Sequence, residues 1–235
     1  MLGNNWLALA VTFALALLWL RFNDYLAHRG WIGSQLSRKI IHAGTGPIFV
    51  LCWLLFTDEP SSRWLAALVP FAITVQFFLV GISVIRDQAA VDGMSRSGDP
   101  REILKGPLYY GIVFVILTIV YWYDSPIGIT ALMMMCGGDG LADVVGKRLP
   151  SQSIPWSPRK TWLGTAAMFT AGWLFSMLIL AVFVLAGKFS TTISSLFFPV
   201  TILAILATLV ESLPMRDIDN LTVPLVCVVA GHLLF

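Results

Sequence analysis

Charged side chains are scarce in this sequence. Asp, Glu, Lys and Arg make up 12% of its 235 residues, whereas 57% of the residues are hydrophobic and the mean hydropathy is +0.82. This composition excludes an ordinary water-soluble domain. The formal net charge of +2 is also too small to indicate nucleic acid as a partner. We therefore expect the chain to lie in a lipid bilayer.

Cysteine is also rare, and the usual motif of soluble ATP-binding proteins is missing. The three cysteines, Cys52, Cys136 and Cys227, fall inside apolar segments without CxxC spacing, which indicates neither a disulfide framework nor a zinc site. No Walker GxxxxGK[ST] segment occurs, so a soluble-type ATP site is not expected. The sequence shows no low-complexity tract and no convincing internal repeat. We therefore expect a single integral membrane domain over residues 1–235.

Long apolar runs are abundant in the sequence. A helix needs about 17–25 apolar residues to cross a hydrocarbon core about 30 Å thick. Eight candidates occur, near residues 4–20, 40–56, 64–85, 107–123, 126–146, 162–187, 193–210 and 221–235. Pro199 and Pro224 interrupt the last two, so a count of seven stays open. The expected fold class is all-α, a polytopic transmembrane helical bundle.

The first apolar run has the length of a signal peptide. Arg21 follows the run directly, and no small-residue cleavage site precedes Asn23. These features favour a retained helix.

Lysine and arginine residues are distributed very unevenly among the seven connections. Thirteen of the fifteen lie in connections one, three, five and seven, namely Arg21, Arg29, Arg38, Lys39, Arg86, Arg96, Arg101, Lys105, Lys147, Arg148, Arg159, Lys160 and Arg216. Only Arg63 and Lys188 fall on the other face. The positive-inside bias predicts that the odd connections are cytoplasmic and that both termini lie outside. Functional groups then gather on one surface, where a water-soluble co-substrate would meet a lipid-soluble one.

Two acidic residues close the fifth apolar run. Asp139 and Asp143 are four residues apart, which places both carboxylates on one helix face. Each charge costs about 2.5–3.5 kcal/mol at membrane depth unless a counter-ion or a water-filled cavity receives it. Carboxylates without histidine or thiolate partners suit Mg²⁺. The neighbours that would give phosphate oxygens room and charge are Gly138, Gly140, Gly146 and Lys147. The alternative is that a nearby Lys or Arg pairs with the acids and that the glycines only permit helix packing.

A basic pair opens the sixth apolar run. Arg159 and Lys160 are followed by Thr161 and Gly164. A helix beginning here would direct its free N–H groups and positive dipole end at an anion. This pattern predicts a phosphate-binding segment. The alternative is that the basic side chains only extend to the membrane surface.

His42 lies at the opening of the second run. It shares a helix face with Arg38 or Lys39, which are three or four residues away. We expect it to act as a phosphate contact or proton acceptor, the alternative being an ordinary buried or interfacial histidine.

A second acidic cluster appears late in the chain. Glu211 ends the seventh run, and Asp217, Asp219 and Asn220 precede the eighth. Asp219 and Asn220 could supply metal or ribose contacts. They could equally cap the final helix.

Five segments together resemble the phytol kinase and dolichol kinase family. In chain order they are RKIIHAGTG, REILKGPLYYG, GDGLADVVGK, PRKTWLGT and ES…DNLTVPL. All of them fall on the same predicted face of the membrane. The resemblance implies a membrane enzyme that transfers the terminal phosphate of a nucleotide, typically CTP, to a prenol hydroxyl with a divalent metal. It also implies a bacterial plasma or thylakoid membrane, with the active site on the cytoplasmic face.

The resemblance also assigns roles by position. CTP phosphates and Mg²⁺ would be held by Asp139, Asp143, Lys147, Arg159, Lys160 and Gly164. Further candidates for nucleotide binding are Arg38, Lys39, Arg101, Lys105, Gly138, Gly140, Gly146, Thr161, Asp219 and Asn220. The candidate catalytic residues are Asp139, Asp143, His42 and Glu211. Asp143 would be a metal ligand, and Asp139 a second ligand or the base.

Phytol is the expected alcohol, because dolichol kinases are generally longer than this chain. The sequence does not exclude farnesol, geranylgeraniol, dolichol or undecaprenol, since the shape of the binding groove determines which length of alcohol is accepted. The wider superfamily contains phosphatidate cytidylyltransferases, whose PGHGG-like stretch is missing here. That activity is the alternative enzyme, and an ion-coupled transporter is the alternative outside catalysis.

Overall fold

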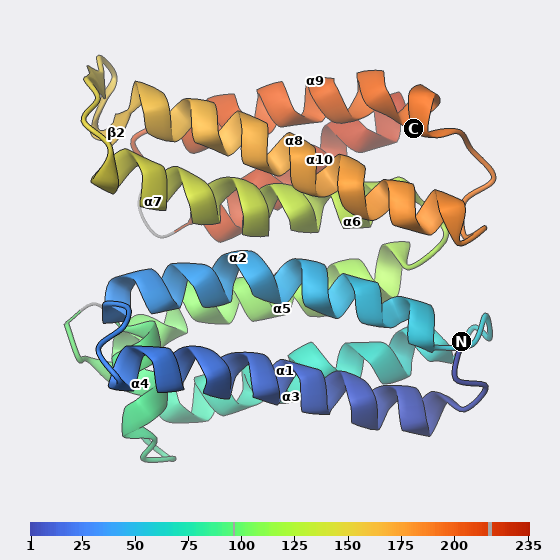
Figure 1. Ribbon diagram of the computed structural model, residues 1–235, viewed down its shortest axis with the longest axis horizontal. Coiled ribbons are helices and arrows are strands. Elements are labelled where there is room, and N and C mark those ends of the chain that lie inside the picture. The colour runs from blue at the N-terminus through green and yellow to red at the C-terminus, as the bar shows by residue number, and fades with distance from the viewer. Residues whose placement is uncertain (96, 216–217) are drawn as a thin grey trace.

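The computed structural model describes residues 1–95, 97–215 and 218–235. Arg96, Arg216 and Asp217 were assigned above to the basic face and to the second acidic cluster, and they lie outside the described residues. The rest of the chain forms a bundle of long helices with short connections (Figure 1).

The helices are α1 (Asn5–His28), α2 (Ser34–Cys52), α3 (Ser62–Gly81), α4 (Gln88–Met94), α5 (Gly106–Tyr121), α6 (Pro126–Met133), α7 (Gly140–Arg148), α8 (Trp162–Leu185), α9 (Ile193–Glu211) and α10 (Asp219–Leu234). Two short 3₁₀ segments are η1 (Trp53–Leu55) and η2 (Pro100–Leu104), and a π-helical segment, η3 (Met134–Asp139), joins α6 to α7. One small antiparallel hairpin, β1 (Ser153–Ile154) with β2 (Ser157–Thr161), interrupts the otherwise all-helical chain.

Six of the eight predicted spans are confirmed by length and composition within the described residues. They are Asn5–His28, Ser62–Gly81, Pro100–Tyr121, Pro126–Arg148, Trp162–Leu185 and Ile193–Glu211. The other two predicted spans are also helices of the bundle, but α10 has only 16 residues and α2 carries Arg38, Lys39 and His42 in its first half. The chain is therefore a multi-pass membrane protein.

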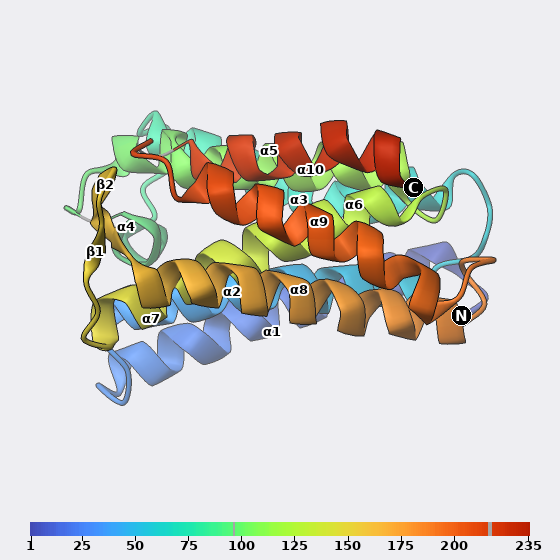
Figure 2. The ribbon, with the colours of Figure 1, turned by 90° about the horizontal axis from the view of Figure 1, so that it is seen from above.

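Both termini lie at the same end of the bundle (Figures 1 and 2). The hairpin and α4 lie at the opposite end. At the terminal end, Arg63 and Lys188 pair with Asp124 and Asp58, respectively. The two basic residues predicted to stand apart from the others thus lie at the end away from the hairpin.

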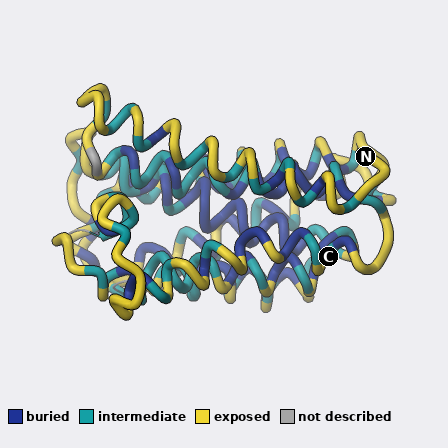
Figure 3. The backbone as a smooth tube through the Cα atoms, turned by 90° about the horizontal axis from the view of Figure 1, so that it is seen from below, coloured by how far each residue is buried: buried dark blue, intermediate teal, exposed yellow. Residues whose placement is uncertain are grey.

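A single segment forms the centre of the bundle. Every residue from 127 to 138, in α6 and η3, is buried, and α5, α8 and α10 pack around α6 (Figure 3). Gly138 permits the approach of α8, because a Cβ at this position would lie 2.7 Å from the sulfur of Met168. The buried segment ends at Asp139, where the chain turns polar.

Candidate active site

A cavity of about 470 Å³ extends from the end of the bundle that carries the hairpin into the interior of the bundle. One part of its wall is polar and comes from the start of α2, from η3 and α7, from β2 and the start of α8, and from the ends of α9 and α10 that face each other. The other part is mostly apolar and comes from α1, α2, α3 and α5. A charged site and an apolar space therefore form one continuous cavity.

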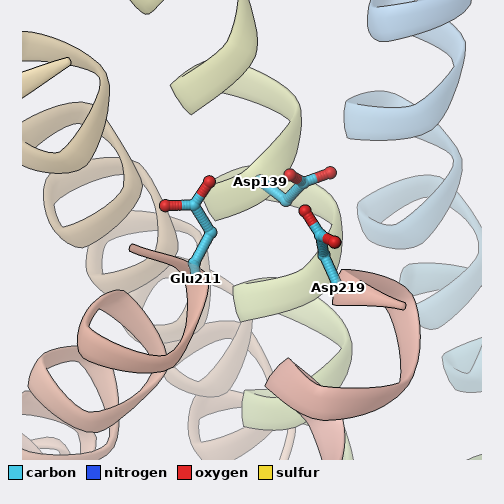
Figure 4. Close-up of side chains that lie close together, drawn as sticks. All are labelled: Asp139, Glu211 and Asp219. Atoms are coloured by element: carbon cyan, nitrogen blue, oxygen red, sulfur yellow. The ribbon is translucent and has the colours of Figure 1, made fainter. Parts of the chain in front are cut away.

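Three carboxylates from distant parts of the chain meet at the polar wall. Asp139 ends η3, Glu211 ends α9 and Asp219 begins α10, and one oxygen of each lies within 4.8 Å of the others (Figure 4). Glu211 is only 5% exposed. Like charges this close repel one another unless cations lie among them.

Lys160 is one of these cations. From β2 its ammonium group donates to Glu211 and lies 3.4 Å from Asp219. Burial alone would lower the pKa of Lys160, but the carboxylates of Glu211, Asp219 and Asp139 outweigh burial and raise this pKa above its usual value. Lys160 therefore stays protonated and partly neutralises the acids.

The lysine leaves part of the oxygen set unsatisfied. Buried Oε2 of Glu211, Oδ1 of Asp219 and Oδ1 of Asn220 have no hydrogen-bond partner in the described part of the chain. Such atoms are rare in native proteins and often mark a site for water or an ion. Carboxylate and amide oxygens are also the ligands that Mg²⁺ and Ca²⁺ prefer. The donor set therefore fits a hard divalent cation.

Asp143 lies beside this cluster and has lysine partners. Lys39 is 3.4 Å from Asp139 and 3.8 Å from Asp143, so both acids face the same ammonium group. Lys147 pairs with Asp143 at 2.8 Å. The predicted proximity of the two acids is present, while the carboxylates grouped with Asp139 are those of Glu211 and Asp219.

His42 borders the same cluster. Its Nε2 lies 3.1 Å from the carbonyl oxygen of Met135 and 3.4 Å from Asp139. Tyr110 donates a hydrogen bond to the carbonyl oxygen of His42 at 2.7 Å, and its ring packs against the imidazole. The histidine is therefore held in place between the acid and the aromatic ring.

The predicted start of the sixth run at residue 162 is confirmed, but the basic pair just before it forms a strand and not a helix start. Arg159 and Lys160 lie on β2, and α8 begins at Trp162. Thr161 caps α8, because its hydroxyl accepts a hydrogen bond from the N–H of Gly164 at 3.2 Å. The basic side chains therefore reach the cavity from a strand. The two prolines of this segment gave no indication that a strand would form here.

The predicted glycines divide into two groups. Gly146 and Gly164 line the cavity where α7 and α8 touch, and a Cβ on Gly164 would lie 3.0 Å from the carbonyl oxygen of Ala142. Gly138 and Gly140 do not line the cavity, since they face Met168 and Ala43.

The remaining candidates also separate. Arg38 and Asn220 line the cavity, whereas Arg101 and Lys105 do not, although the adjacent Gly106 does. Asn220 donates to the carbonyl oxygen of Gly106 at 2.9 Å. Neither Asp219 nor Asn220 caps α10, since its N-cap makes no side-chain hydrogen bond. The capping alternative was therefore wrong.

Tyr110 and Thr165 are among the lining residues that escaped the sequence analysis. Tyr110 lies within one of the quoted motifs, and that position was the available signal. Thr165, one turn into α8, has a buried hydroxyl oxygen without a hydrogen-bond partner in the described residues, and its place at the end of the quoted motif PRKTWLGT was the available signal.

Comparison with known proteins finds relatives over most of the chain. A probable chloroplastic phytol kinase from Triticum aestivum is 41% identical over 214 residues, which cover 90% of this chain and 71% of the relative. Phytol kinase 1, chloroplastic, from Arabidopsis thaliana is 36% identical over 214 residues, with 90% and 70% covered. Farnesol kinase, chloroplastic, from the same plant is 38% identical over 230 residues, with 97% and 75% covered. No family model and no solved structure matches the chain.

Proposed function

The chain belongs to the phytol kinase and farnesol kinase family of prenol phosphotransferases, and we propose that it transfers the terminal phosphate of CTP to phytol. The observation that carries this proposal is the single cavity in which three carboxylates and several basic side chains adjoin an apolar space. A nucleotide needs the first part, and the hydrocarbon of an alcohol needs the second. Farnesol is the alternative alcohol, because one relative is a farnesol kinase.

We assign the divalent cation to Asp139, Glu211 and Asp219, with Oδ1 of Asn220 as a further donor. When bound, Mg²⁺ supplies positive charge that offsets the developing charge of a transferring phosphoryl group. This assignment revises the predicted pair, because the carboxylates grouped with Asp139 within 4.8 Å are those of Glu211 and Asp219, whereas Asp143 pairs with Lys147 beside this cluster. Asp143 then serves to position Lys147.

The basic residues around the acids would bind the triphosphate. Lys39, Lys147 and Arg159 line the cavity, and the side chain of Arg159 makes no ion pair within the described residues. Lys160 holds Glu211 and Asp219 in place and keeps two of their oxygens directed to the lysine. Positioning and electrostatic stabilisation account for most of the catalysis in phosphoryl transfer.

The reaction itself needs one proton acceptor. As the alcohol oxygen forms its bond to the γ-phosphorus, the bond from that phosphorus to the β-phosphate oxygen breaks and CDP leaves. The hydroxyl proton has to move to a base within hydrogen-bond reach. We assign this role to Nδ1 of His42, because its Nε2 faces two acceptors, the carbonyl oxygen of Met135 and the carboxylate of Asp139, and therefore carries a proton.

The membrane topology that we propose has eight crossings. It counts α2 and α10 in addition to the six long apolar helices, which agrees with both termini lying at one end (Figure 1). The hairpin end, which carries the basic connections, would face the cytoplasm of a bacterial plasma or thylakoid membrane. CTP would reach the site from that side, and the protein would work as one membrane domain.

One incubation tests the reaction. Purified protein in detergent would receive γ-labelled CTP and Mg²⁺, with phytol, farnesol, geranylgeraniol or phosphatidate as acceptor. We expect label in the lipid product with phytol as the best acceptor, and parallel reactions with ATP and UTP would rank the donors. Release of pyrophosphate with phosphatidate would instead show a cytidylyltransferase, and no labelled lipid from any alcohol would contradict the proposal.

A further inference from the structure

The apolar part of the cavity extends far beyond the charged cluster. On α2 the lining begins at Arg38 and Lys39 and ends at Cys52. Lys39 and Cys52 are thirteen residues apart, which corresponds to about 20 Å along a helix. This distance is roughly two thirds of a hydrocarbon core of about 30 Å. The cavity therefore reaches deep into the membrane-spanning part of the bundle.

Four helices line this extension. α1 packs against α2 and α3, and α3 packs against α5. At the end away from the acids the lining residues are Thr12, Cys52, Val69 and Phe114, each at most 4% exposed. The extension is thus a channel that ends among buried side chains and is continuous with the charged cluster at its other end.

The few hydroxyl groups in this channel are already used. Thr12 donates to the carbonyl oxygen of Ala8 at 2.7 Å, and Thr45 donates to that of Ile41 at 2.6 Å. A threonine bonded to the preceding turn of its own helix presents its methyl group and little polarity. The channel therefore offers hydrocarbon along its length and no free hydroxyl donor for a polar ligand from these two threonines.

We propose that this channel binds the isoprenoid tail of the alcohol and that Ala16 and Ile73 line the path of the tail, so that their size sets how much tail can pass toward the far end. The proposal rests on the proposed function and adds the location of the tail. Continuity with the charged cluster identifies the occupant, because a chain whose hydroxyl lies at His42 and Asp139 has to place its tail here. Ala16 lies on α1 between Leu20 and Thr12, about one helical turn from each, and Ile73 lines the channel from α3.

Substitutions that fill the channel test the proposal. Ala16→Phe and Ile73→Phe, purified in detergent, would be assayed with CTP and a series of alcohols that grow by one isoprene unit from geraniol to geranylgeraniol, together with phytol. We expect kcat/KM for phytol to fall about tenfold or more relative to geraniol, because a pocket that loses room for several carbons discriminates at least this strongly. The KM for CTP should not change.

Matched controls separate a local effect from misfolding. Ala14→Phe makes the same change on an exposed position of α1 and should keep the wild-type ranking of alcohols. Retained turnover of geraniol in Ala16→Phe shows that the polar site is intact. An equal loss for every alcohol, or no loss for phytol in either channel variant, would overturn the channel assignment.

The outcome distinguishes this proposal from the proposed function. If the wild-type protein phosphorylates no alcohol, the function fails before the channel is tested. If it phosphorylates alcohols without a length-dependent effect of the two variants, and native mass spectrometry shows a retained phospholipid that phytol does not displace, the channel holds a bilayer lipid and only the tail assignment fails.

Discussion

Glu211 is the one charged residue that is buried among those described, and only one of its oxygens has a partner. Removing its charge while keeping its shape should therefore weaken a cation ligand, because a neutral amide oxygen replaces a charged carboxylate oxygen. We expect Glu211→Gln to lower kcat/KM by about 100-fold or more and to raise the Mg²⁺ concentration needed for half-maximal rate. Mg²⁺ titrations of activity, together with the rise in Tm caused by Mn²⁺ without substrate, would measure both effects.

Glu59→Gln provides the matched control, because Glu59 is an exposed carboxylate at the other end of the bundle. It should leave the Mg²⁺ dependence unchanged. Wild-type Mg²⁺ dependence in Glu211→Gln would remove Glu211 from the cation site.

Asp139 and Asp143 should contribute unequally. Asp139 lies within 4.8 Å of Glu211 and Asp219, whereas Asp143 has Lys39 and Lys147 as neighbours. We expect Asp139→Asn to lower kcat by about 100-fold or more. Asp143→Asn should mainly raise the KM for CTP, by about tenfold, because it frees Lys147 from its position while Lys39 keeps its contact with Asp139. Equal effects of both variants on Mg²⁺ dependence would instead favour the adjacent pair as the cation site.

At the scale of single residues, the sequence predicts what is local. The spacing of Asp139 and Asp143 correctly predicts that they share a neighbourhood, because four residues make about one helical turn. The grouping of Asp139 with Glu211 and Asp219 depends on how η3, α9 and α10 pack, and no spacing in the chain encodes it. The sequence therefore identifies these acids as candidates but does not show which of them lie close together.

At the scale of elements, the contact between α7 and α8 positions the basic segment. Gly164 faces Gly146, and a Cβ added to Gly164 would lie only 3.2 Å from the Cα of Gly146. We expect Gly164→Ala to force the helices apart and to lower the free energy of unfolding by about 1–3 kcal/mol. Kinase activity should fall together with the free energy of unfolding, because Thr161 and Lys160 directly precede this contact in the chain.

The matched control for this contact is Gly93→Ala on α4, where a Cβ would meet nothing within 4 Å. This variant should keep or slightly raise stability. Thermal unfolding in detergent would compare the two. A Gly164→Ala protein as stable as Gly93→Ala would show that the close approach is not required.

Apolar runs predict where helices occur but not where each one ends. α1 continues from Arg21 to His28, because a helix needs no apolar residues once it leaves the hydrocarbon. The hairpin of β1 and β2 was missed, since Pro155 and Pro158 indicate a loop rather than a strand. The π-helical turn at η3 was missed as well, because its extra residue per turn leaves no mark in the apolar pattern.

At the scale of the whole molecule, the two ends should face different compartments. Gln152 lies at the hairpin end and Ser190 at the terminal end, and both are exposed. We expect an impermeant thiol reagent to label Ser190→Cys but not Gln152→Cys in intact cells. The background should be low because Cys52, Cys136 and Cys227 are buried. Permeabilised cells provide the control, since both sites should then react, and the reverse pattern in intact cells would invert the topology.

The central claim is that residues far apart in the chain form one cation and nucleotide site above an apolar channel. An experimental structure with Mg²⁺ and a non-hydrolysable CTP analogue would test it most directly. We predict the ion about 2.0–2.1 Å from carboxylate oxygens of Asp139, Glu211 and Asp219, with the triphosphate against Lys39 and Arg159. An ion bound by Asp139 and Asp143 while Glu211 and Asp219 remain on Lys160, or a nucleotide outside this cavity, would contradict the account.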